Sequence, residues 1–125
     1  MKELILKKCK NCGAFIKVIN DCHCDNCGIK CCDKEMIVVK ANSTDAAFEK
    51  HVPTYERKNG KLIVNVNHVM EEDHYIEWIC LVTETKEEYK YFNPGDKPEC
   101  EFEDVKEGTL YSYCNKHSLW KIDIK

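Results

Sequence analysis

The sequence lacks the features that would direct it to a membrane, to secretion or to a charged polymer. No segment approaches the ~20 consecutive apolar residues that a membrane helix needs. The first eight residues contain too short an apolar run for a signal peptide and no small-residue cleavage site. With 19 basic and 22 acidic residues the formal charge is −3, so no net positive field attracts nucleic acid or anionic lipid. We therefore expect a cytoplasmic protein that binds neither nucleic acid nor membranes.

What the sequence does contain is ten cysteines among 125 residues. In a secreted chain this density would predict a disulfide framework, but in reducing cytosol it more often indicates bound metal. Seven cysteines fall within the first 32 residues, and the other three are Cys80, Cys100 and Cys114. This uneven distribution predicts two domains, a Cys-rich metal-binding module over residues 1–37 and a second domain over residues 38–125.

The second domain has the pattern of an all-β fold. Residues 52–56 and 61–67 flank Asn59-Gly60, the strongest short hairpin signal, because both central residues of a type I′ turn need a positive φ. Leu62, Val64 and Val66 alternate along the second segment and are expected to face the core. Further strands are expected at residues 75–82, 89–92, 101–105, 110–113 and 119–124. This spacing predicts an antiparallel β-sandwich.

The module has little apolar surface to bury. Only residues 4–6 and 15–19 are typical of short strands, and about 37 residues rarely fold without a metal or another crosslink. Metal binding is therefore expected to stabilise it. In the segment that joins the domains, a short helical turn is expected at residues 46–48, capped by a side chain from residues 43–45.

The module's cysteines form recognisable metal-binding spacings. Cys9 and Cys12 are separated by two residues, so both thiolates can face one ion, and Gly13 permits the tight turn that follows. A four-sulfur site has two possible completions, namely the adjacent pair Cys31 and Cys32 or a second knuckle at Cys24 and Cys27. The metal is also open at this point, since iron, zinc and an iron–sulfur cluster all accept thiolates.

The histidines indicate a second metal site. Four of the five lie at predicted strand ends or loops, namely His51, His68, His74 and His117. Cys114 precedes His117 by three residues, so that a thiolate and an imidazole can bind the same ion. Four imidazoles and one thiolate exceed the four ligands of a structural zinc site and leave one octahedral position open for chemistry. A thiolate opposite that position donates electron density, which suits iron and one-electron oxygen chemistry.

Three separated segments together resemble the desulfoferrodoxin and superoxide reductase family. They are residues 49–53 (EKHVP), 68–79 (HVMEEDHYIEWI) and 113–121 (YCNKHSLWK), and residues 43–45 and 93–96 agree with them. The resemblance implies an immunoglobulin-like β-sandwich from about residue 42 and a preceding desulforedoxin-like module. It implies a catalytic iron with four equatorial histidines, His51, His68, His74 and His117, and axial Cys114. It also implies a second iron on Cys9, Cys12, Cys31 and Cys32.

The implied activity is the one-electron reduction of superoxide to hydrogen peroxide. By this resemblance Lys50 attracts superoxide and supports its protonation, and Glu49 is similar to the carboxylate that fills the sixth position of the resting ferric iron. A rubredoxin-like electron donor and a homodimer are expected. Two departures from the family pattern lie beside ligands: Val69 stands where proline is usual, and Ser118 where glycine is usual. We expect these to reshape loops without abolishing activity.

A further departure lies in the module, where the interval between Cys12 and Cys31 is longer than usual and carries three additional cysteines, Cys22, Cys24 and Cys27. It leaves the ligand set of the first metal site open between the two completions.

Two other functions are compatible with parts of the pattern. A non-catalytic electron carrier with iron or copper can also be a small β-sandwich, but blue-copper sites use two histidines, one cysteine and a weak axial ligand, often methionine. No methionine follows Cys114, and four histidines are available. A zinc-ribbon binding module attached to a β domain is favoured by the paired knuckles and disfavoured, for nucleic acid, by the acidic charge.

Overall fold

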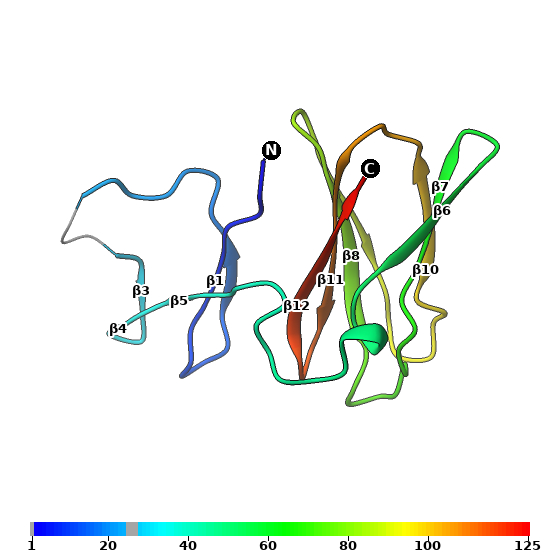
Figure 1. Ribbon diagram of the computed structural model, residues 1–125. Helices are drawn as coiled ribbons and strands as arrows, with labels where there is room; N and C mark the ends of the chain where they lie inside the picture. Colours follow the sequence, from blue (N-terminus) through cyan, green and yellow to red (C-terminus); the bar gives the residue numbers. More distant parts are fainter. Residues whose placement is uncertain (1, 25–27) are drawn as a thin grey trace. The chain divides into compact units, whose positions relative to one another are not determined.

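The computed structural model describes residues 2–24 and 28–125, so Cys27 lies outside the described residues. The chain divides into two compact units, Glu3–Lys40 and a second unit of Ala41–Lys125 with Lys2 (Figure 1). Each unit is described by itself. The division of the chain into domains at residues 1–37 and 38–125 remains a prediction. Among the described residues, no helix is long and apolar enough to cross a bilayer.

The first unit consists of short strands. They are β1 (Leu6–Lys8), β2 (Phe15–Lys17), β3 (Lys30–Cys31), β4 (Lys34–Glu35) and β5 (Ile37–Val38). An antiparallel sheet has the order β2-β1-β5, and β3 pairs with β4 as a separate hairpin. The two residues of the β3–β4 turn, Cys32 and Asp33, both have positive φ (53° and 60°), as a type I′ turn requires.

The second unit is a two-layered antiparallel β-sandwich. Its elements are the 3₁₀ turn η1 (Phe48–Lys50) and the strands β6 (Thr54–Lys58), β7 (Lys61–Asn65), β8 (Ile76–Val82), β9 (Glu87–Tyr91), β10 (Glu99–Glu103), β11 (Gly108–Cys114) and β12 (Ser118–Ile124). One sheet has the order β10-β7-β6 and the other β12-β11-β8-β9. Leu62 and Phe102 from the first sheet share one buried cluster with Ile79, Leu81 and Leu110 from the second. The predicted all-β sandwich fold is confirmed.

The β6–β7 hairpin forms where the sequence predicts it. Asn59 and Gly60 occupy the turn with φ values of 54° and 76°, so both central residues have the left-handed conformation of a type I′ turn. Leu62, Val64 and Val66 are all less than 2% exposed, as the alternation predicts. The turn and the buried face together fix the register of this sheet.

The helical turn differs from the expectation. It spans Phe48–Lys50 rather than residues 46–48, and Ala47 at its N-cap makes no side-chain cap bond. Bonds from Lys50 N–H to the Ala47 carbonyl (3.2 Å) and from His51 N–H to the Phe48 carbonyl (3.1 Å) define it as 3₁₀. The His51 side chain also bonds the Ala47 carbonyl, so the turn is stabilised by a residue after it rather than by a cap before it.

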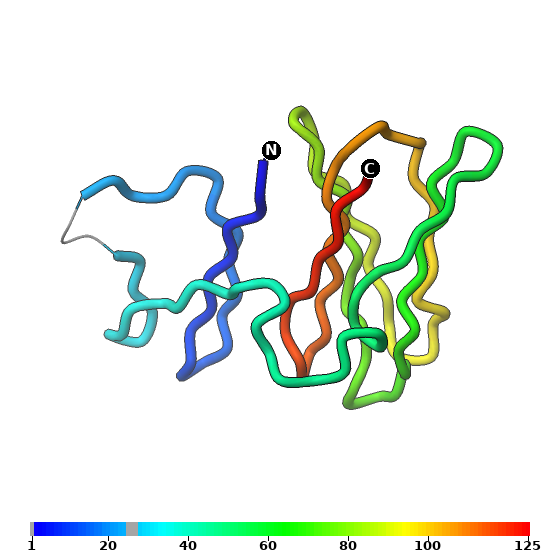
Figure 2. The backbone as a smooth tube through the Cα atoms, in the orientation of Figure 1, coloured from blue at the N-terminus to red at the C-terminus, as the bar shows by residue number. Residues whose placement is uncertain are grey.

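Three connections lie at one end of the sandwich. Figure 2 shows η1, the connection between β7 and β8, and the turn between β11 and β12 close to one another at the lower end of the view. These segments carry the five predicted ligands of the second metal site. Antiparallel strands of two facing sheets thus bring together residues that are far apart in the sequence.

Candidate metal centres

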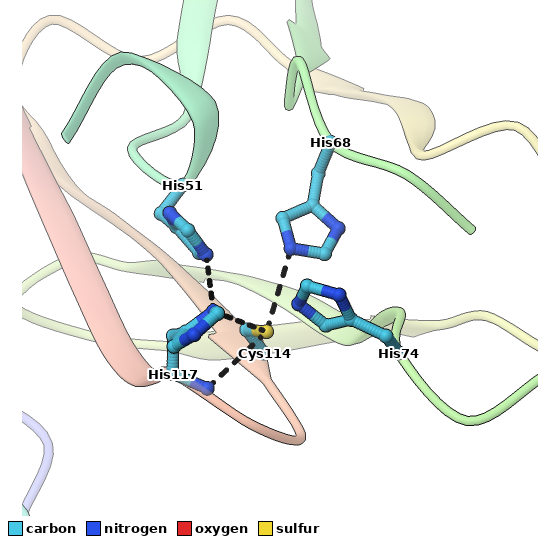
Figure 3. A group of neighbouring side chains, drawn as sticks. All are labelled: His51, His68, His74, Cys114 and His117. Carbon is cyan, nitrogen blue, oxygen red and sulfur yellow. Dashed lines mark hydrogen bonds between the residues drawn. The ribbon is translucent and has the colours of Figure 1, made fainter. Parts of the chain in front are cut away.

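Five side chains converge at this end of the sandwich (Figure 3). His51 directly follows η1, His68 and His74 come from the β7–β8 connection, and Cys114 and His117 flank the β11–β12 turn. Each residue offers one ligand atom, and these five atoms all lie within 4.8 Å of one another. The structure therefore brings together all five residues that the sequence assigns to the catalytic iron.

Backbone carbonyls orient two of the imidazole rings. His51 Nδ1 lies 2.7 Å from the carbonyl oxygen of Ala47, and His68 Nδ1 lies 2.5 Å from that of Val69. A carbonyl only accepts, so Nδ1 carries the proton in both rings and Nε2 keeps its lone pair. Both rings are thus fixed in the tautomer that offers Nε2 to a metal.

The remaining distances identify the other donor atoms. His51 Nε2 lies 3.0 Å from Nδ1 of His117, and Cys114 Sγ lies 3.4 Å from His68 Nε2 and 3.9 Å from His117 Nδ1. Two nitrogens that bind one ion at about 2.1 Å and at a right angle would lie about 3 Å apart. The separation between His51 and His117 fits a shared ion.

His74 supplies an independent test of the metal assignment. Its Nε2 is buried, and no described residue gives it a hydrogen-bond partner. An unsatisfied buried polar atom costs roughly 1–3 kcal/mol and is rare in native proteins. A metal bound by His74 Nε2 removes that cost. With one thiolate and four imidazoles around the same point, the donor set fits iron.

Burial prepares the ligands for a cation. Burial lowers the pKa of His51 and of His68, so both rings are held in the neutral form that a metal requires. Burial also raises the pKa of Cys114, and the N–H groups of Lys116 and His117 oppose that shift. The His117 N–H lies 3.4 Å from Sγ. A bound cation stabilises the thiolate directly.

The four-sulfur group lies in the first unit. Its members are Cys9, Cys12, Cys31 and Cys32, with all four sulfurs within 4.8 Å of one another. Cys12 Sγ and Cys32 Sγ lie 3.6 Å and 4.0 Å from Cys31 Sγ. Four sulfurs that surround one ion tetrahedrally at about 2.3 Å would lie about 3.8 Å apart. The cysteines therefore have the spacing of a tetrahedral metal site.

Electrostatics within this group also favours a cation. The Cys12 N–H points at Cys9 Sγ at 3.5 Å and lowers the pKa of Cys9 to about 6. Hydrogen bonding to Cys12, Cys9 and Cys32 raises the pKa of Cys31 to about 12. Four adjacent thiols cannot all ionise without a positive charge between them, and a metal ion supplies that charge.

Of the two completions that the sequence leaves open, the structure assembles the one with Cys31 and Cys32. Cys24 belongs to neither metal group among the described residues, and Cys27 lies outside them. Cys22 and Cys24 are exposed, and His23 joins neither group. The described cysteines form no disulfide.

Glu49 and Lys50, the residues with predicted catalytic roles, are exposed on η1 immediately before His51. The Glu49 charge opposes the effect of burial on the His51 pKa. The roles of Glu49 and Lys50 stay predictions.

Sequence reasoning missed two contacts that hold ligand backbones in place. Ser112 Oγ donates to the His51 carbonyl at 2.5 Å, and Trp120 Nε1 donates to the His117 carbonyl at 2.9 Å. The Trp120 ring also stacks on the His51 ring, with 4.9 Å between centroids. The position of Trp120 within the 113–121 motif was a signal, but nothing local to Ser112 indicates a partner 61 residues away.

Comparison with known proteins agrees with this geometry. The profile of the family described as desulfoferrodoxin matches residues 43–123. The desulfoferrodoxin of Clostridium acetobutylicum is 38% identical over 125 residues, with 98% of both chains covered. That of Nitratidesulfovibrio vulgaris is 39% identical over 121 residues, with 93% of both covered.

Solved structures of superoxide reductases share the fold. That of Treponema pallidum has a TM-score of 0.71 and 25% identity, and the match covers 97% of this chain and 99% of that one. That of Giardia intestinalis has a TM-score of 0.54 and 26% identity, and covers 62% of this chain and 98% of that one. The chain therefore belongs to the desulfoferrodoxin family, and its His4Cys and four-Cys groups match the two iron sites of that family.

Proposed function

We propose that the protein is a superoxide reductase that acts at the His4Cys centre. The observation that carries this proposal is the group of four imidazoles and one thiolate at the end of the sandwich. This is one donor more than a structural tetrahedral site uses. The likeness to the superoxide reductases of Treponema pallidum and Giardia intestinalis supports the choice of substrate.

The overall reaction takes one electron and two protons per superoxide and gives one hydrogen peroxide. When bound, iron(II) supplies the electron and is oxidised to iron(III). The chain's own residues hold this centre, attract the anion and provide the surroundings in which protons reach it. An external donor then restores the electron, and a rubredoxin-like protein remains the predicted donor.

Lys50 is assigned to the capture of superoxide. Lys50 is exposed and directly precedes His51 in the sequence, while the chain as a whole carries a formal charge of −3. A local cation beside the site raises the concentration of a small anion there despite the unfavourable net charge. The same positive charge stabilises the negative charge that develops as superoxide is reduced.

Glu49 is assigned to the resting state. It is exposed on the same turn, and its carboxylate is a hard oxygen donor next to a ligand. Its carboxylate would serve as an additional oxygen donor to a bound ferric iron when no superoxide is present. Cys114, fully buried, would hold the iron through its sulfur, and the His117 N–H bond would moderate how strongly that sulfur donates electrons.

Peroxide yield tests the reaction. Protein purified without oxygen is analysed for iron and zinc, reduced, and mixed with a known amount of superoxide. One peroxide per superoxide consumed supports a reductase, whereas half that yield indicates a dismutase. Iron that is oxidised without peroxide formation, or a site filled with copper, favours a non-catalytic electron carrier.

Exchange of Lys50 tests the capture step. Lys50→Ala is expected to keep both irons and to slow the reaction with superoxide by roughly tenfold at low ionic strength, with a smaller effect in salt. Lys58→Ala is the matched control, since Lys58 is exposed on β6 and its loss changes the net charge equally. Equal effects of the two variants would refute the local role of Lys50.

The oligomeric state and the cellular location remain predictions, namely a homodimer and the cytoplasm.

A further inference from the structure

Asn115 joins two segments that carry ligands. Its Oδ1 accepts a bond from the Tyr75 N–H at 2.9 Å, and its Nδ2 donates to the Asp73 carbonyl at 3.0 Å. Its own backbone N–H donates to the Tyr75 carbonyl at 3.2 Å. Asp73 and Tyr75 are the two neighbours of His74, so the side chain holds the backbone on both sides of this ligand.

His74 depends on such support more than the His51 and His68 rings do. The His51 and His68 rings are each oriented by a bond from Nδ1 to a backbone carbonyl. No comparable bond to a carbonyl is found for His74 among the described residues, and its buried Nε2 has no partner. The position of this ring is therefore determined mainly by the position of its backbone.

The regular sheet does not fix that backbone. Tyr113 pairs with Trp78 in the β11–β8 ladder, but Cys114 pairs with Ile76, so the register shifts between the two pairs. Such an irregularity interrupts the ladder where the ligands begin. Two backbone bonds between Glu71 and His74 close a local turn but do not connect it to the Cys114 segment. Asn115 provides that connection through hydrogen bonds, and the only other polar side-chain link between these segments that the described residues show is an exposed ion pair between Lys116 and Asp73 at 3.7 Å.

We propose that Asn115 is a positioning residue that places His74 for the metal and thereby raises the affinity of the His4Cys centre for iron. Both ends of the amide are needed, because one accepts from an N–H and the other donates to a carbonyl. The inference rests on the metal centre and not on its reaction with superoxide, so iron binding tests it independently of activity.

The chain offers a matched control in Asn42. Its Nδ2 donates to the Lys121 carbonyl at 3.2 Å, and its Oδ1 accepts from the Lys121 N–H at 2.9 Å. The same two kinds of bond are thus made in the same unit, but to a residue that does not adjoin a ligand. Asn115→Ala and Asn42→Ala each remove one such pair of bonds. Asn42 also has a φ of 59°, so alanine there adds backbone strain, and the control is the more demanding one for general stability.

Chelator competition on the full chain measures the effect. Asn115→Ala is expected to bind the His4Cys iron at least about tenfold more weakly, as is common when a residue that orients a ligand is lost. Asn42→Ala is expected to stay within about twofold of the parent. The four-Cys iron of the same molecules is the internal reference and is expected to be unchanged.

A conservative variant and a spectroscopic signature separate positioning from general stability. Asn115→Asp keeps the acceptor for Tyr75 N–H and loses the donor, so its iron affinity is expected between those of the parent and Asn115→Ala. Asn115→Ala is also expected to change the electron paramagnetic resonance spectrum of the ferric His4Cys centre. Parental affinity and spectrum in Asn115→Ala, or equal losses of affinity in the two alanine variants, would overturn the proposal. If Asn115→Ala does not fold, the iron affinity and the spectrum of Asn115→Asp are compared with those of the parent by the same criteria.

Discussion

The two units hold their metal groups with very different amounts of surrounding protein. In the sandwich, ten buried residues form one cluster that draws on both sheets, and the ligands lie at the end of this core. Among the described residues of the first unit, the buried apolar ones are Leu4, Leu6, Val18 and Met36, together with the ligand Cys9. The sandwich can therefore present its ligands before metal binds, whereas the metal group of the first unit is itself a large part of the core.

Backbone strain falls on a metal ligand itself in the first unit and only beside a ligand in the sandwich. The β3–β4 turn places Cys32 and Asp33 at positive φ, although neither is glycine and Cys32 is a ligand. Left-handed residues other than glycine cost roughly 1–2 kcal/mol each, and a metal bound by Cys32 would offset part of this cost. In the sandwich the ligand segments are instead held by side-chain bonds such as those of Ser112 and Trp120.

Removal of both metals tests most directly whether the two units differ in their dependence on metal, and it is expected to have the largest effect. Structural metal sites of this kind contribute roughly 10 kcal/mol to folding, so the first unit is expected to unfold while the sandwich stays folded. Amide hydrogen exchange measures this directly. The Leu6 and Lys8 amides in β1 are expected to lose protection, while Leu62 and Val64 keep theirs. Protection of β1 in the metal-free chain would show that its few apolar residues suffice.

His74→Ala tests whether the sandwich stays folded without its metal. The variant is expected to lose the sandwich iron and all activity with superoxide, because one of five ligands is absent, but to keep the sandwich fold. Iron content should fall from two to one per chain, with the circular dichroism spectrum unchanged. His23→Ala is the control, since His23 belongs to neither metal group. Loss of the fold in His74→Ala would show that the sandwich also depends on its metal.

The reactivity of the thiols gives another measure of the difference between the sandwich and the first unit. Burial raises the pKa of Cys100 to about 12, so at pH 8 little of it is thiolate. Against an ordinary pKa of about 9, its thiolate fraction is roughly 10³ lower, and its alkylation is expected to slow accordingly and to accelerate as pH rises towards 12. After metal removal, Cys12 and Cys32 of the first unit should be labelled rapidly. Mass spectrometry of timed samples distinguishes these sites, and fast labelling of Cys100 would contradict its burial.

Local patterns predicted the parts of the structure that local forces determine. The Asn59-Gly60 turn and the alternation at Leu62 and Val64 gave the β6–β7 hairpin and its buried face, because both signals act within a few residues. The five ligands of the sandwich followed from spacing and family resemblance. The N-terminal ligand set did not follow from spacing alone, since the type I′ turn at Cys32-Asp33 carries no Asn-Gly signal.

Long-range contacts explain the rest. The Asn115 amide bonds backbone groups 40 and 42 residues away, and Ser112 bonds one 61 residues away. No periodicity or spacing in the sequence indicates such pairs, because they depend on how three loops meet. The 3₁₀ turn before His51 was placed wrongly for the same reason: the His51 side chain, not a preceding cap, bonds the Ala47 carbonyl.

The smallest expected effect concerns Ser118, the one strained residue that adjoins the sandwich ligands. Its φ of 68° lies in the left-handed region, which glycine, the residue expected here from the family resemblance, adopts without strain. Relief of this strain is worth roughly 1–2 kcal/mol, and the greater freedom of glycine in the unfolded chain offsets about half of it. Ser118→Gly is therefore expected to raise the unfolding free energy of the metal-free sandwich by up to about 1 kcal/mol.

Urea unfolding followed by tryptophan fluorescence checks this value, since Trp78 and Trp120 both lie in the sandwich. Ser43→Gly is the control: Ser43 does not have a positive φ, so the same exchange there is expected to lower stability. If Ser118→Gly lowered stability as well, the left-handed conformation of Ser118 would have to be maintained without cost by its surroundings. The sandwich would then tolerate strain next to its ligands as the first unit does at Cys32, and the contrast between a preformed and a metal-dependent site would be weaker.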